Sequence, residues 1–68
     1  MYCIMNRKGE YLARTDIPVE WSSDEGDALG WKTRPAAEGM LRRLWSAPIA
    51  RRIGVKVAYI YPPQEGSK

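Results

Sequence analysis

The chain has 68 residues, of which 28% are charged and 44% hydrophobic, a balance typical of one small globular domain rather than a disordered polyelectrolyte. It contains no histidine and one cysteine, which excludes a Cys/His zinc site, an imidazole base and an internal disulfide. Apolar runs are only a few residues long, and charges at Arg7, Lys8 and Glu10 interrupt the N-terminus, so we expect no membrane span, no signal peptide and a cytoplasmic location.

The first 14 residues predict a β-hairpin. Residues 2–5 are apolar and partly β-prone, and residues 10–14 return as a second strand. Between them, Asn6 can bond the backbone ahead of it, and Gly9 can take the positive φ that a type I turn followed by a G1 bulge requires. We therefore expect two antiparallel strands.

Residues 15–30 are harder to assign. Asp16 and Pro18 break regularity, and a polar stretch follows at 22–27. A compact domain disfavours a structureless loop of this length, so we expect a packed excursion with Trp21 at least partly buried. Residues 29–32 are predicted to form a short extra strand.

A helix is predicted from Arg34 to Trp45. Thr33 is a good N-cap, and Pro35 occupies the first turn, where its missing N–H does no harm. The i, i+4, i+7 spacing of apolar residues gives the helix one buried stripe, made of Ala37, Leu41 and Leu44.

Two elements follow this helix. Residues 46–53 can form a second short helix that ends at Gly54. Residues 55–61 are β-branched and aromatic on alternate positions, and Ala58 and Ile60 make the second face apolar as well, so we place this strand at the centre of the sheet.

The order of elements is β-β-(β)-α-β. It predicts a small α+β domain over residues 1–63, with one helix packed on a three- or four-stranded, mainly antiparallel sheet, and a flexible tail at 64–68. So small a core leaves a thin stability margin, and a homodimer would widen it.

Charge is divided by segment. Residues 10–27 hold six carboxylates against Arg14, a net charge of −5, whereas residues 32–56 hold seven cations against Glu38, a net charge of +6. One interpretation is that the acidic loop folds back on the basic part and neutralises it. The other is that the asymmetry marks an acidic or nucleic-acid partner.

Two further features are weak candidates for chemistry. Asp24, Glu25 and Asp27 lack the alternate ligand spacing and the closing Glu of a calcium loop, and they read as a solvated acidic loop. Cys3 has no histidine to activate it and reads as a buried structural thiol. We therefore expect no catalysis, no metal site and no cofactor.

The best candidate for a binding surface is a basic set with an aromatic beside it. Guanidinium groups can grip phosphates while an aromatic stacks a base, or they can anchor an acidic protein surface around a Trp hot spot. The alternative is a solvated helix face with a tryptophan at its boundary. The set consists of Arg42, Arg43, Trp45, Arg51, Arg52 and Lys56.

Several motifs resemble small uncharacterised proteins encoded by bacteriophages and prophages. They are Tyr2-x-Ile4, Gly9-Glu10-Tyr11-Leu12, Trp21, and Trp31-Lys32-Thr33-Arg34 leading into Ala37-Glu38 and Leu41-x-x-Leu44. These motifs are structural, so the resemblance implies no enzymatic activity. It implies an accessory gene product that acts on host machinery, commonly as a stoichiometric binder.

The sequence thus favours a non-enzymatic protein-interaction module, phage-derived, that inhibits or modulates a host complex such as a CRISPR effector, a restriction system or RNA polymerase. Its partner would be a host protein or a nucleoprotein complex in the bacterial cytoplasm. The alternative is a small nucleic-acid-binding accessory domain that uses the basic segment 34–56. A net charge of only +3 argues against that alternative, because non-specific binding rests on phosphate neutralisation. If the basic surface is not the site, the acidic patch of Asp24, Glu25 and Asp27 is the next candidate.

Overall fold

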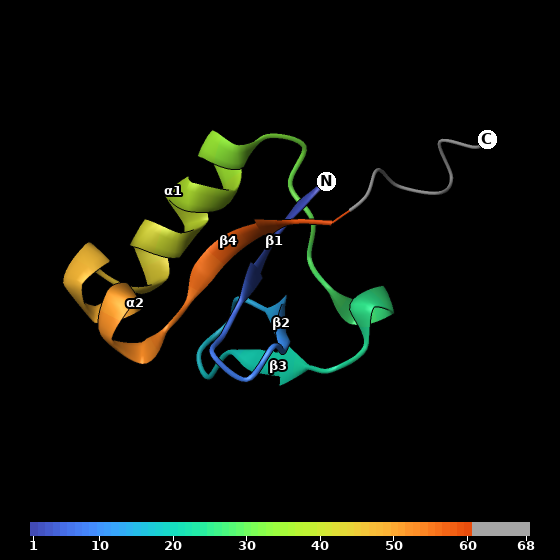
Figure 1. Cartoon of the computed structure of the whole chain (residues 1–68), viewed down its shortest axis with the longest axis horizontal. Helices are drawn as coiled ribbons and strands as arrows, with labels where there is room; N and C mark the ends of the chain where they lie inside the picture. Colours follow the sequence, from blue (N-terminus) through green and yellow to red (C-terminus); the bar gives the residue numbers. More distant parts are fainter. Residues whose placement is uncertain (61–68) are drawn as a thin grey trace.

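A computed structural model describes residues 1–60 of the chain as a four-stranded antiparallel sheet with two helices, an α+β fold (Figure 1). The strand order is β3-β2-β1-β4, and α1 contacts both β1 and β4. The predicted α+β fold class is confirmed. The predicted architecture included one helix on the sheet, and the structure has a second helix as well. In chain order, the elements are β1 (Tyr2–Met5), β2 (Tyr11–Arg14), β3 (Glu20–Ser22), the 3-10 turn η1 (Glu25–Asp27), α1 (Arg34–Leu44), α2 (Ala47–Ile53) and β4 (Lys56–Tyr59).

The hairpin between β1 and β2 forms as predicted, with the return strand beginning at Tyr11. The backbone N–H of Gly9 donates to the carbonyl of Asn6 at 3.0 Å, and Gly9 has a φ of 84°. The Asn6 side-chain oxygen accepts from the N–H groups of Lys8 and Glu10 at 3.0 and 2.9 Å. The turn is therefore held by the asparagine and closed by the glycine, as a G1 bulge requires.

The extra strand lies elsewhere than predicted. It is β3, at Glu20–Ser22, which pairs with β2, whereas residues 29–32 contribute only an isolated bridge between Trp31 and Tyr2. The reason is the position of Trp21, which lies opposite Leu12 in the β2–β3 register and packs against the core. Trp21, which we expected to be at least partly buried in a packed loop, therefore lies in a strand.

Helix α1 begins where the sequence places it. The Thr33 hydroxyl accepts from the N–H of Ala36 at 3.3 Å, and Ala37 is fully buried. The helix ends at Leu44, one residue earlier than predicted, with Trp45 as an extended C-cap. Its apolar stripe covers a core cluster made of Ile4, Leu12 and Val55.

Helix α2 and its end point are also confirmed. Gly54 takes a φ of 82°, and its N–H donates to the carbonyl of Ala50 at 2.9 Å. A Cβ at this position would lie 2.8 Å from the Nε of Arg7, so both the backbone angle and the space favour glycine. This turn directs the chain from α2 into β4.

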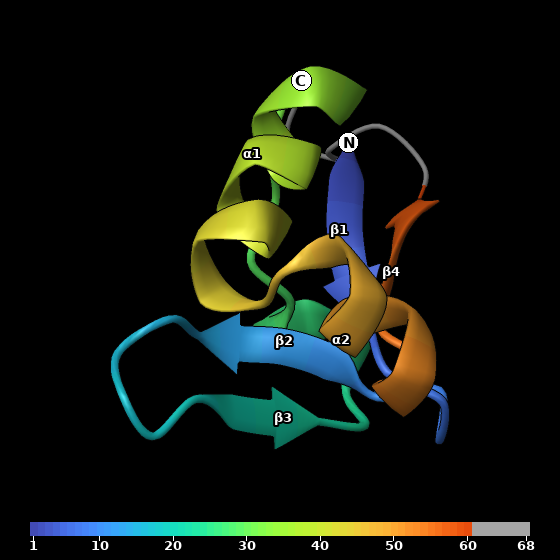
Figure 2. The same ribbon diagram turned by 90° about the vertical axis from the view of Figure 1, so that its left-hand side faces the viewer.

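Strand β4 lies at an edge of the sheet, not at its centre (Figure 2). The central position belongs to β1, which pairs with β4 along its whole length on one side and with β2 and Trp31 on the other. The central placement was inferred from the apolar residues on both faces of the strand. Such residues indicate packing above and below the sheet, but they do not determine whether the strand has a hydrogen-bonded neighbour on each side. Tyr61 and the predicted tail at 64–68 lie outside the described residues.

Within residues 1–60, no helix is long and apolar enough to cross a membrane.

Gly9 and Gly39 have different backbone conformations, so replacing each of them with alanine should change the free energy of unfolding in opposite directions. Gly9→Ala places a Cβ at positive φ and should lower the free energy of unfolding by about 1 kcal/mol. Gly39→Ala, in the exposed middle of α1 with no atom near the new Cβ, should raise it by about 0.5–1 kcal/mol. Urea denaturation of both variants measures the pair, and a stabilising Gly9→Ala would contradict the turn assignment.

Candidate binding groove

A groove of about 490 Å³ lies between α1, α2 and β4. Leu41 lines it from α1, Val55 from the position just before β4, and Val57 from β4. These same side chains belong to the core cluster or pack against it, so the apolar part of the groove is continuous with the interior. The rigid elements around the groove therefore hold its shape.

Four cations line this groove: Arg34, Arg42, Arg51 and Lys56. Arg34 is partly neutralised, because its Nη1 lies 3.3 Å from the carboxylate of Glu38, and its guanidinium lies 5.8 Å from the centre of the Tyr2 ring. The other three make no ion pair with any residue in 1–60. The groove thus combines an apolar surface with three cations that lack a counter-charge in the described chain.

Trp45 also lines the groove, but its ring is already partly engaged. It stacks on Trp21 of β3, with ring centroids 5.9 Å apart and an interplanar angle of 25°. As the C-cap of α1, its N–H donates to the carbonyl of Leu41 at 2.8 Å. Trp45 therefore connects α1 to the sheet, and one of its faces is covered within the fold.

The structure divides the predicted basic set. It brings Arg42, Trp45, Arg51 and Lys56 together in the groove, whereas Arg43 and Arg52 are exposed and do not line it. Sequence reasoning missed two groove residues on α1, Arg34 and Glu38. Their spacing with Arg42 at i, i+4 and i+8 places all three along one helix face, and that spacing was the available signal.

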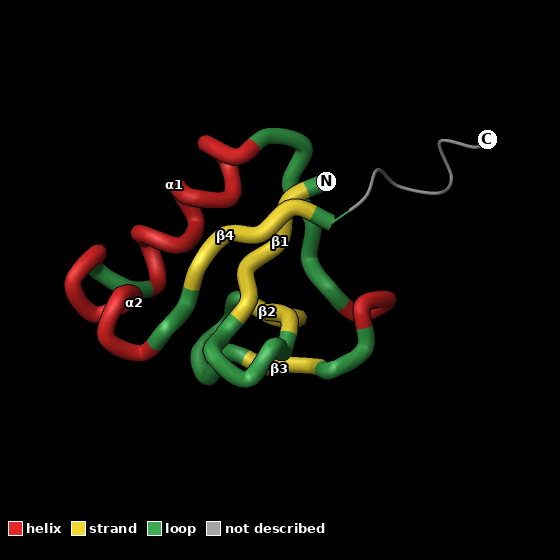
Figure 3. The backbone as a smooth tube through the Cα atoms, viewed as in Figure 1, coloured by secondary structure: helices red, strands yellow, loops and turns green. Residues whose placement is uncertain are grey.

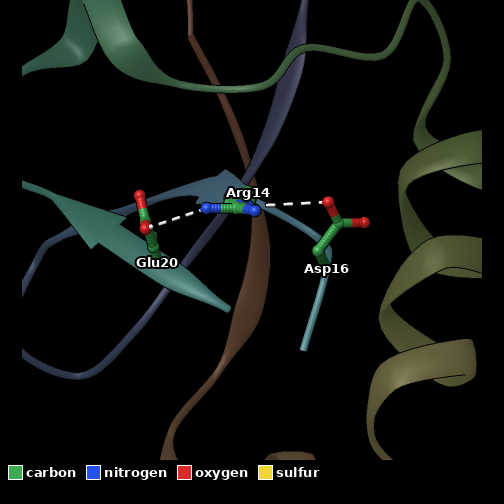
Figure 4. A network of polar contacts seen from close by, with 3 residues as sticks. All are labelled: Arg14, Asp16 and Glu20. Atoms are coloured by element: carbon green, nitrogen blue, oxygen red, sulfur yellow. Dashed lines mark hydrogen bonds and ion pairs between the residues drawn. The ribbon is translucent and has the colours of Figure 1, made fainter. Parts of the chain in front are cut away.

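Two carboxylates of the acidic segment pair with its one arginine, Arg14 (Figure 4). The Arg14 Nη1 lies 3.2 Å from Oε2 of Glu20, and its Nε lies 3.5 Å from Oδ2 of Asp16. The third ion pair among the described residues joins Arg34 to Glu38. No described ion pair links the acidic segment 10–27 to the basic segment 32–56.

The predicted acidic patch forms the η1 turn. The Asp24 carboxylate accepts from the N–H of Gly26 at 2.9 Å, the Ser22 hydroxyl donates to Asp27 at 2.8 Å, and one Glu25 oxygen is buried without a partner in residues 1–60. The turn lies at the opposite end of the molecule from α2 (Figures 1 and 3). The interpretation that this loop covers the basic segment is therefore wrong, and the groove cations are left uncovered by it.

Cys3 is fully buried in β1, as predicted. Burial raises the pKa of its thiol above the ordinary value of 9.0; the negative charge of Glu25 raises it further, and the N-terminal ammonium opposes the shift. A thiol with a raised pKa is a poor nucleophile at neutral pH. Among the described residues, no three carboxylate or thiol side chains converge to hold a metal ion.

Comparison of the chain with protein-family models, curated proteins and solved structures gave no match. The resemblance to phage-encoded proteins therefore stays a prediction, and a function has to be argued from the residues.

The raised pKa of Cys3 predicts a pH dependence of stability. The unfolded thiol releases its proton near pH 9, whereas the folded thiol keeps it to higher pH, so the contribution is complete below pH 9 and is lost as pH rises further. Between pH 8 and 11, the free energy of unfolding should fall more steeply for the wild type than for Cys3→Ala. Equal slopes in urea titrations of the two proteins would contradict the assignment.

Proposed function

We propose that the protein is a non-enzymatic interaction module that binds an acidic surface of a partner protein through the groove between α1, α2 and β4. The observation that carries the proposal is the set of three cations without a described counter-charge, Arg42, Arg51 and Lys56, around an apolar surface. Arginine is enriched among the residues that contribute most binding energy at protein interfaces, and the buried centre of an interface is more apolar than its rim.

Three features favour a protein partner over the alternative, a nucleic acid. The groove exposes Leu41 and Val57 beside its cations, which suits apolar side chains better than phosphates. The Trp45 ring, which a base would need for stacking, is covered on one face by Trp21. A net charge of only +3 also disfavours non-specific binding to nucleic acid, which rests on phosphate neutralisation.

The resemblance of the sequence to phage-encoded proteins supplies the proposed context. In that context, the partner is a protein of a host complex in the bacterial cytoplasm, such as a CRISPR effector, a restriction system or RNA polymerase. The module acts stoichiometrically, by occupying an acidic surface that the host complex uses. A second copy of the chain is not required for this action.

The division of the basic residues provides a matched test. Arg42→Glu/Arg51→Glu reverses two groove cations, whereas Arg43→Glu/Arg52→Glu reverses two cations outside the groove with the same change in net charge. Exposed charges rarely change stability by more than about 0.5 kcal/mol, so both variants should fold. In affinity capture from nuclease-treated bacterial lysate, the groove variant should lose the partner and the control should retain it.

The outcomes separate the two candidate functions. Equal loss in both variants would show a general charge effect and contradict a groove-specific interface. Capture that disappears with nuclease, and that weakens by orders of magnitude between 50 and 200 mM salt (roughly the range over which phosphate contacts are lost), would favour the nucleic-acid alternative.

A further inference from the structure

The register of β1 with β4 shows which backbone groups of β4 are free. Met1 and Ile60 exchange hydrogen bonds, whereas Tyr2, opposite Tyr59, exchanges its bonds with Trp31 on the other side of β1. Hydrogen-bonded pairs alternate along an antiparallel ladder. The N–H and C=O groups of Val57 and Tyr59 therefore point away from β1, toward the outer edge of the sheet.

This outer edge has no strand neighbour within residues 1–60. Folded proteins usually protect an edge with charges, prolines or short strands, because free backbone groups pair readily with another chain. The opposite edge, β3, fits that rule, with three residues and an irregular register against β2. On β4, Lys56 is the only charged residue, and Tyr59 is 56% exposed.

The free edge adjoins the binding groove. Val57 contributes its side chain to the groove and its backbone to the edge, and Lys56 precedes it. Arg42 and Arg51 line the same groove from α1 and α2. An extended chain laid along β4 would therefore place every second side chain on the groove side of the sheet, near an apolar surface and cations.

We infer that the protein binds its partner by strand addition: an extended acidic segment of the partner pairs with β4 as a fifth strand. This inference rests on the proposed function and specifies the form of the ligand. The N–H and C=O groups of Val57 and Tyr59 supply the backbone bonds. Carboxylates of the segment meet Arg42 and Arg51, and apolar side chains between them lie against Leu41 and Val57.

The test uses a blocked ten-residue peptide, labelled with a fluorophore, in 25 mM salt. It has threonine at every second position and glutamate and valine in turn at the positions between, so that one face of the extended peptide carries both carboxylates and apolar side chains. Tyr59→Pro removes the outward N–H, a position where an edge strand accepts proline, and Tyr59→Ala removes the same ring but keeps the N–H. Anisotropy titration should show at least tenfold weaker binding for Tyr59→Pro than for Tyr59→Ala. In the wild type, NMR should show intermolecular contacts between the peptide backbone and the backbone protons of Val57 and Tyr59, a readout that does not depend on the folding of either variant.

Each other outcome overturns the inference. Equal affinity of Tyr59→Pro and Tyr59→Ala, absence of the backbone contacts, or no binding of the peptide rules out strand addition. If strand addition fails in one of these ways but Arg42→Glu/Arg51→Glu still loses the lysate partner, the proposed function of the groove stands and only the strand-addition inference is overturned. Concentration-dependent dimerisation that Tyr59→Pro abolishes would show that a second copy, not an acidic partner, occupies the edge.

Discussion

The antiparallel pairing of β1 with β4 is the constraint on which the rest of the structure depends. It joins the first and last described residues, Met1 and Ile60, and places Ile4 opposite Val57. Closing so long a stretch of chain costs conformational entropy, which the burial of Ile4 and its neighbours under α1 has to offset. In return, it fixes β4 at the edge of the sheet and creates the groove beside it.

The distribution of charge follows from the same arrangement. The β2–β3 hairpin and η1 hold the acidic residues on the far side of β1 from β4, where Arg14 and local hydrogen bonds satisfy most of them. The basic residues come from α1, α2 and the start of β4, which meet at the groove. A chain with a modest net charge thus presents a local concentration of cations, which is what an acidic partner requires for attraction and orientation.

Local features of the fold could be predicted from the sequence, and long-range ones could not. Asn6 and Gly9 define their turn, Thr33 defines the start of α1 and Gly54 the end of α2, because each acts on backbone within a few residues. The position of β3 depends on Trp21 meeting Leu12 and Trp45, and the edge position of β4 depends on which strand β1 accepts as a neighbour. The groove joins residues from three elements, so sequence reasoning found three of its four cations and missed Arg34. It also included Arg43 and Arg52, which do not line the groove.

Amide hydrogen exchange of the free protein tests most directly whether the outer edge of β4 is free. Alternate residues of one strand should differ: the amides of Lys56 and Ala58, which point to β1, should be protected, whereas those of Val57 and Tyr59 should exchange at rates close to those of an unstructured chain. Protection of all four amides in the monomer would show that the edge is already covered, and it would contradict both the edge assignment and strand addition.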